Sequence, residues 1–133
     1  MKLRDMIKRH EGYRSKPYLC SAGKLTIGWG HNLDDNGISK TVAELMLDED
    51  IQSAYYDIMD IFPNFYLYSQ KRQNALIDMM FNLGKPSFRG FGKMIAAIKK
   101  EDWKEVAVQA KDSDWYRKGK RRATKIEQML RDG

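Results

Sequence analysis

Three side chains near the start of the chain have the chemistry for proton transfer or nucleophilic attack. Eight residues separate Glu11 from Cys20, the only cysteine, and five residues separate Cys20 from Thr26. A protonated carboxyl group can act as a general acid, a thiolate as a base or nucleophile, and a hydroxyl group can orient a water molecule. A carboxylic acid held neutral near pH 7 is what hydrolysis of a glycosidic bond requires.

Each of these residues also has an ordinary structural interpretation. Most glutamates are solvated at the surface, and a free cysteine is usually a small buried side chain. For Glu11, the negative end of a helix dipole and burial in a cleft would both favour the protonated carboxyl group. Arg14 and the basic C-terminal segment would favour its charged form instead. Residue types and spacing alone leave both interpretations open.

The segment that precedes the cysteine is predicted to be a helix. Apolar residues recur at helical spacing from Leu3 to His10, with charged residues between them. Gly12 is a helix stop signal, so the first helix occupies residues 1–12 and Glu11 lies in its last turn.

The segment that carries the thiol and the hydroxyl group is predicted to be a small antiparallel sheet. Its glycines disfavour a long helix, whereas Tyr18 and residues 25–29 are good strand formers. Residues 21–24 are typical of a hairpin turn, and the turn residues DDNG at 34–37 end the sheet. This β lobe covers residues 13–37.

The remainder, residues 38–133, is predicted to be a helical lobe. Thr41 and Glu44 match a capping box at the start of a helix that ends before Pro63. Further helices are expected from Ser69 to Gly84, around Met94 to Ile98, from Trp103 to Ala110 and from Ala123 to Leu130. We therefore predict one α+β, mostly α, domain over residues 1–133, with two lobes and a substrate cleft between them.

Composition restricts the partners and cofactors. The net charge of +6 indicates a polyanionic partner, which leaves nucleic acid, an anionic membrane surface and the bacterial cell wall as candidates. One cysteine excludes an intramolecular disulfide, and two histidines without zinc-site spacing argue against a metal. No apolar run is long enough to span a membrane, and the charged first residues lack the apolar core of a secretory signal.

The spacing of Glu11, Cys20 and Thr26, followed by the segment TIGWGH, resembles the phage lysozymes of the T-even type, glycoside hydrolase family 24. That family has Glu, eight residues, Asp or Cys, five residues, Thr, and then TIGxGH. Residues 72–84 and 90–123 are also similar to the central and C-terminal helices of the family. The main departure is a much shorter passage, NLDDNGISK, between the hairpin and the next helix.

The resemblance implies a role for each matching residue. Glu11 corresponds to the general acid, Cys20 to the second catalytic position, where many relatives have Asp, and Thr26 to a residue that orients the attacking water. Cys20 could act as a base, as a nucleophile or as a spacer that holds the shape of the site. The positions implied in substrate binding are Gly30, Asn32, Phe81 and Gln109. His31 corresponds to a structural histidine paired with a carboxylate that aligns with Asp50.

The function that the resemblance implies is an endolysin that cleaves the β-1,4 bond between N-acetylmuramic acid and N-acetylglucosamine in peptidoglycan, so that the host cell lyses. It also implies that the protein waits in the host cytoplasm until a holin opens a path to the cell wall. Acid-assisted hydrolysis needs no cofactor, and a monomer is the simplest expectation. A catalytically inactive peptidoglycan-binding domain is the alternative. A nucleic-acid-binding module, suggested by KGKRRATK at residues 118–125, is disfavoured because no recognition motif accompanies this run.

Overall fold

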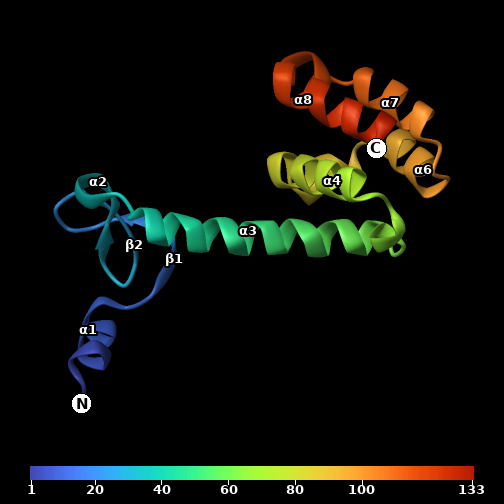
Figure 1. Ribbon diagram of the computed structural model, residues 1–133. Coiled ribbons are helices and arrows are strands. Elements are labelled where there is room, and N and C mark those ends of the chain that lie inside the picture. Colours follow the sequence, from blue (N-terminus) through green and yellow to red (C-terminus); the bar gives the residue numbers. More distant parts are fainter. The chain divides into compact units, whose positions relative to one another are not determined.

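The computed structural model describes residues 1–133, which divide into two compact units, Met1–Met46 and Leu47–Gly133 (Figure 1). The first unit contains α1 (Leu3–Glu11), β1 (Arg14–Leu19), β2 (Leu25–Gly28), β3 (His31–Asn32), α2 (Leu33–Asn36) and the beginning of α3 (Lys40–Ile61). The second contains the rest of α3, the 3-10 turn η1 (Phe65–Leu67), α4 (Gln70–Leu83), α5 (Lys85–Arg89), α6 (Gly92–Lys99), α7 (Trp103–Lys111) and α8 (Asp114–Asp132). The predicted mostly helical α+β class is confirmed.

The boundary between the units lies inside α3, whereas the sequence placed the boundary between the lobes at residue 37. The single domain with a cleft between two lobes stays a prediction.

The predicted hairpin is confirmed, and it forms part of a three-stranded antiparallel sheet with the order β1-β2-β3. Tyr18 pairs with Thr26, and Leu19 pairs with Leu25. The connecting turn closes where the Cys20 N–H donates to the Lys24 carbonyl oxygen at 2.9 Å. The hairpin therefore places the thiol at the end of β1, beside the start of β2.

Of the two predictions made for the segments that flank the sheet, one is confirmed and one is wrong. Helix α1 ends at Gly12, which has a φ of 72° and donates its N–H to the Lys8 carbonyl oxygen, as the stop signal predicted. The segment 34–37 was expected to be a turn, but most of it belongs to the short helix α2. The Asn32 side chain accepts a hydrogen bond from the Asp35 N–H at 2.9 Å, which stabilises this helical turn.

The predicted cap of α3 is wrong by two residues. Helix α3 begins at Lys40, and the Ser39 hydroxyl oxygen accepts a hydrogen bond from the Val42 N–H at 3.2 Å. Ser39 therefore supplies the side-chain cap, while Thr41 lies inside the first turn. The end of α3 before Pro63 is confirmed.

The second unit contains the hydrophobic core, and the predicted helices after α3 are confirmed with two differences. Helix α5 was not predicted, and α8 begins at Asp114 because the Ser113 hydroxyl oxygen accepts a hydrogen bond from the Tyr116 N–H at 3.1 Å. Lys120 has non-helical dihedral angles (φ 48°, ψ −120°) and kinks α8 near its middle. The core includes buried residues from α3, α4, α6, α7 and α8, among them Ile58, Leu76, Met80, Ile98, Val106 and Leu130.

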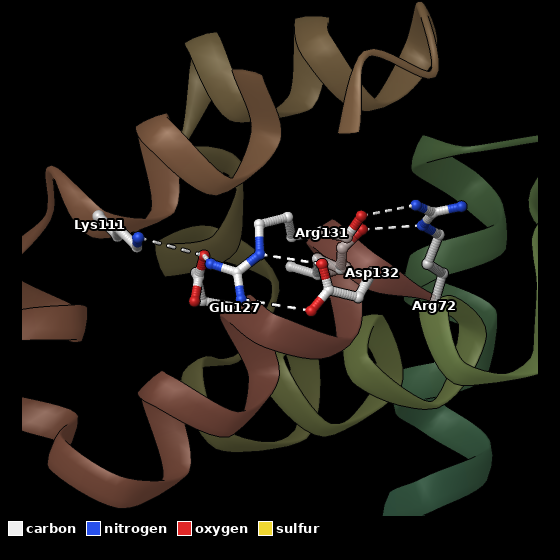
Figure 2. Close-up of polar contacts among 6 residues, drawn as sticks. Arg72, Lys111, Glu127, Arg131 and Asp132 are labelled. Atoms are coloured by element: carbon white, nitrogen blue, oxygen red, sulfur yellow. Dashed lines mark hydrogen bonds and ion pairs between the residues drawn. The ribbon is translucent and has the colours of Figure 1, made fainter. Parts of the chain in front are cut away.

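A buried carboxylate links the last two helices (Figure 2). Glu127 on α8 is only 1% exposed, and its Oε1 atom lies 2.9 Å from Arg131 Nη1 and 3.5 Å from Lys111 Nζ on α7. The Arg72 guanidinium on α4 donates to two backbone carbonyl groups in the last turn of α8. These contacts hold α4, α7 and the end of α8 together: α7 provides a cation for the buried carboxylate of α8, and α4 provides donors for carbonyl groups in the last turn of α8.

Candidate active site

The carboxyl group of Glu11 lies directly against Gly30, in the turn between β2 and β3. A Cβ atom built on Gly30 would be 2.5 Å from Glu11 Oε2 and 2.7 Å from its Cδ, so only glycine leaves room for the carboxyl group. Gly30 also has a φ of 78°, which disfavours any residue with a side chain. The sequence assigned Gly30 to substrate binding, and the structure adds that it positions Glu11. Its contact with substrate stays a prediction.

Cys20 and Thr26 lie together across the hairpin. Hydrogen bonds to the sulfur from the backbone of Lys24 and then of Ala22 lower the pKa of the Cys20 thiol below its ordinary value, and the Thr26 hydroxyl group adds to this. Desolvation opposes the shift without cancelling it. The geometry therefore favours a larger thiolate fraction near neutral pH than a free cysteine has.

Thr26 is buried within the sheet and its hydroxyl group is oriented by the backbone. Only 3% of Thr26 is exposed, and its Oγ1 atom donates a hydrogen bond to the Lys24 carbonyl oxygen at 2.8 Å. A hydroxyl group has one proton to donate and two lone pairs to accept with. While the Thr26 hydroxyl group donates to the Lys24 carbonyl oxygen, its own oxygen atom can accept a hydrogen bond from the thiol or from water. The hydroxyl group must rotate before it can donate a hydrogen bond to a thiolate.

Two further residues of this segment make contacts within the first unit. The Asn32 amide accepts from the Asp35 N–H and donates to the Asp35 carboxylate at 2.9 Å, so both of its polar ends are engaged at the start of α2. His31 Nε2 contacts the Gly37 carbonyl oxygen. The pairing of His31 with Asp50 and the contact of Asn32 with substrate stay predictions.

The remaining predicted substrate residues, Phe81 and Gln109, belong to the second unit. Phe81 on α4 is 41% exposed, which leaves its ring available to a ligand. Gln109 on α7 donates from Nε2 to Glu105 Oε1 at 2.7 Å and lines a hollow of about 710 Å³. Their assignment to the substrate site stays a prediction.

No group of three or more His, Cys, Asp or Glu side chains is arranged to hold a metal ion. None of the helices combines the length and the apolar character needed to cross a membrane.

Residues 8–129, nearly the whole chain, match the family model described as phage lysozyme. The chain therefore belongs to the phage lysozyme family, which confirms the family expected from the motif. This membership, together with relatives named as lysozymes and endolysins, supports a lysozyme-type hydrolase.

Three relatives show how the similarity is distributed. The pre-baseplate central spike protein Gp5 of Enterobacteria phage T4 is 25% identical over 161 residues, which cover 100% of this chain and 28% of the spike protein. The probable T4-type lysozyme 2 of Dictyostelium discoideum is 25% identical over 160 residues, covering 98% of this chain and 94% of the relative. The endolysin of Acyrthosiphon pisum secondary endosymbiont phage 1 is 36% identical over 89 residues, covering 62% and 58%. The chain thus spans less than two thirds of the spike protein and of this endolysin.

Proposed function

We propose that the protein is a muramidase that hydrolyses the β-1,4 bond between N-acetylmuramic acid and N-acetylglucosamine in peptidoglycan and thereby lyses the host cell. The observation that carries this proposal is the hairpin that sets the Cys20 thiol beside the Thr26 hydroxyl group, with Glu11 held against Gly30 a few residues further along. The family membership supports the same reaction class.

In the proposed reaction Glu11 acts as the general acid. Its carboxylic proton passes to the glycosidic oxygen while the bond between that oxygen and the anomeric carbon breaks. A water molecule held by Cys20 and Thr26 attacks the anomeric carbon and loses a proton to the Cys20 thiolate. The cycle leaves a carboxylate and a thiol, and exchange of protons with solvent restores the starting state.

The contacts around the sulfur favour a base over a spacer. The lowered pKa of Cys20 gives a larger thiolate fraction at any given pH than a free cysteine has, and the oriented Thr26 oxygen can accept a hydrogen bond from the same water. Water activation by a base inverts the anomeric configuration, whereas direct attack by the thiolate would retain it. NMR of the first product anomer distinguishes the two: an α product supports the base, and a β product with a thioglycosyl adduct by mass spectrometry supports the nucleophile.

The substrate contacts and the cellular setting complete the proposal. Gly30, Asn32, Phe81 and Gln109 are proposed to contact the glycan strand, as the matching positions of the family imply. We propose that the protein acts as a monomer without a cofactor and reaches the cell wall from the host cytoplasm when a holin opens the membrane. Because the net charge is +6, electrostatic attraction to the anionic wall supports binding there.

The test is hydrolysis of permeabilised Gram-negative cells by the parent and by Glu11→Gln, which keeps the shape of the side chain and removes the transferable proton. We expect a loss of about 10²- to 10⁴-fold, the range for removal of a general acid. Asp5→Asn makes the same change from carboxyl to amide on the exposed surface of the same helix and serves as the control. A parent protein that binds cell walls but releases no new reducing ends would contradict the proposal and identify an inactive wall-binding domain.

A further inference from the structure

The peptide group between Lys24 and Leu25 carries hydrogen bonds from both members of the thiol–hydroxyl pair in the hairpin. Its carbonyl oxygen accepts from the Cys20 N–H at 2.9 Å and from Thr26 Oγ1 at 2.8 Å. The Lys24 backbone also forms a hydrogen bond with the Cys20 sulfur. A movement of this peptide group would therefore displace the thiol and the hydroxyl group together.

The N–H of the same peptide group lies at a part of the sheet edge that β3 does not reach. Strand β3 pairs with β2 only as far as Asn32, opposite Thr26, and the chain then enters α2. The Leu25 N–H, one residue before Thr26, thus has no strand beside it on that side. The Asp34 carboxylate takes this place, because its Oδ2 atom accepts a hydrogen bond from the Leu25 N–H.

A second carboxylate of α2 holds the side chain of Lys24. Asp35 Oδ1 lies 3.1 Å from Lys24 Nζ, and Asp35 Oδ2 accepts from Asn32 Nδ2 at 2.9 Å. Both aspartates of α2 are exposed, so water can reach the groups that they bind. Asp34 acts more directly than Asp35, because it contacts the peptide group itself, whereas Asp35 contacts the end of a long and exposed side chain.

We propose that Asp34 is a positioning residue for the reaction. By fixing the Lys24–Leu25 peptide group, it holds the Thr26 hydroxyl group and the Cys20 thiol in the arrangement that the reaction uses. The inference rests on the proposed function for the roles of these two groups. A hydrogen bond to a carboxylate is stronger than one to a neutral oxygen, and a peptide group that donates such a bond becomes a better acceptor at its own carbonyl oxygen.

The test compares Asp34→Ala and Asp34→Asn with the parent. Hydrogen exchange of the Leu25 amide, followed by NMR, should become faster in the order parent, Asn, Ala, because asparagine still offers a neutral acceptor. The pH midpoint of Cys20 alkylation should rise in the same order, because the backbone of Lys24 is the main group that lowers the pKa of the thiol. In Asp34→Ala, kcat for wall hydrolysis should fall by about tenfold with KM nearly unchanged, since displaced catalytic groups slow the chemical step.

Asp102→Ala is the matched control in the second unit. The Asp102 carboxylate likewise accepts a backbone hydrogen bond, from the Glu105 N–H at the start of α7. This variant should lower the unfolding temperature about as much as Asp34→Ala does, because each loses one exposed hydrogen bond between a carboxylate and the backbone. It should leave the alkylation midpoint and kcat at their parental values.

The proposal is overturned if Asp34→Ala keeps the parental alkylation midpoint and kcat, or if Asp102→Ala changes them as much. If Asp34→Ala does not fold, Asp34→Asn decides the question: parental exchange of the Leu25 amide together with a parental midpoint overturns the proposal. Exchange and alkylation require no turnover. A parent protein without hydrolytic activity would therefore refute the proposed function, while these two measurements would still show whether Asp34 positions the thiol.

Discussion

The contact between Gly30 and Glu11 gives the sharpest test of how the site is built. In Gly30→Ala the new Cβ atom would stand 2.5 Å from Glu11 Oε2, whereas ordinary contacts begin at 3.4 Å, so the carboxyl group must move by about 1 Å. A displacement of that size in a catalytic group costs on the order of 10²-fold in rate. The positive φ of Gly30 adds a backbone cost of about 1–2 kcal/mol in stability.

Gly28 provides the matched control for this substitution. It has a similar φ of 68°, but a Cβ atom at Gly28 would have nothing within 4 Å. Gly28→Ala should therefore lose about the same 1–2 kcal/mol of stability and keep most of the activity. The assays are urea unfolding for stability and release of reducing ends from purified cell walls for activity.

A double-mutant cycle separates the positioning of Glu11 from a direct effect on substrate. If the cost of Gly30→Ala arises from Glu11, the free energy of unfolding lost through Gly30→Ala should be smaller in a Glu11→Ala background, where the clash is absent. The reasoning is refuted if Gly30→Ala retains parental activity, if Gly28→Ala loses as much activity, or if the cycle shows no coupling.

Four other predictions follow from the contacts described. The rate of Cys20 alkylation should rise with pH through a midpoint below that of the same cysteine in a short unstructured peptide, because the backbone of Lys24 and then of Ala22, together with Thr26, lowers the pKa of the thiol; Thr26→Val should shift that midpoint upward and Thr26→Ser should not. Activity that depends on the thiolate should fall as the pH is lowered through the same midpoint, and Cys20→Ala should reduce hydrolysis by about 10²-fold or more, while an unchanged rate would exclude Cys20 from the reaction. Glu127→Ala should lower the free energy of unfolding, measured in guanidinium, by about 2–3 kcal/mol, because the buried carboxylate and its two ion pairs are lost. Glu127→Leu should cost less, because an apolar side chain fills the buried space and the two cationic partners, which are partly exposed, can return to water. Wall binding in a pelleting assay should weaken as salt rises from about 0.05 to 0.3 M, and binding that is independent of salt would contradict an electrostatic contribution from the net charge of +6.

Local signals in the sequence determined the order and type of most elements. Gly12 ends α1 because glycine tolerates the positive φ found there, and β-forming residues on both sides of a short turn specify the hairpin. These features depend on neighbours within a few residues, which the sequence displays directly. The motif that ends in TIGWGH also determined the family and the positions expected to carry the chemistry.

Closely matched local signals were harder to separate. Ser39 and Thr41 are both good capping residues, and the sequence favoured Thr41 because Glu44 follows it in a capping-box pattern. The structure uses Ser39, since the side chain that reaches an unpaired N–H depends on where the first turn begins.

Tertiary packing decided which groups share an environment. No pattern in the chain indicates that Glu127 is buried, because its counter-charges come from its own helix and from α7. The sequence likewise contains Asp112, Asp114 and several nearby cations without showing that Arg117 forms ion pairs with both carboxylates. The burial of Glu127 and its contact with Lys111 arise because α7 and α8 pack together, and only the folded structure shows which of several nearby cations each carboxylate pairs with.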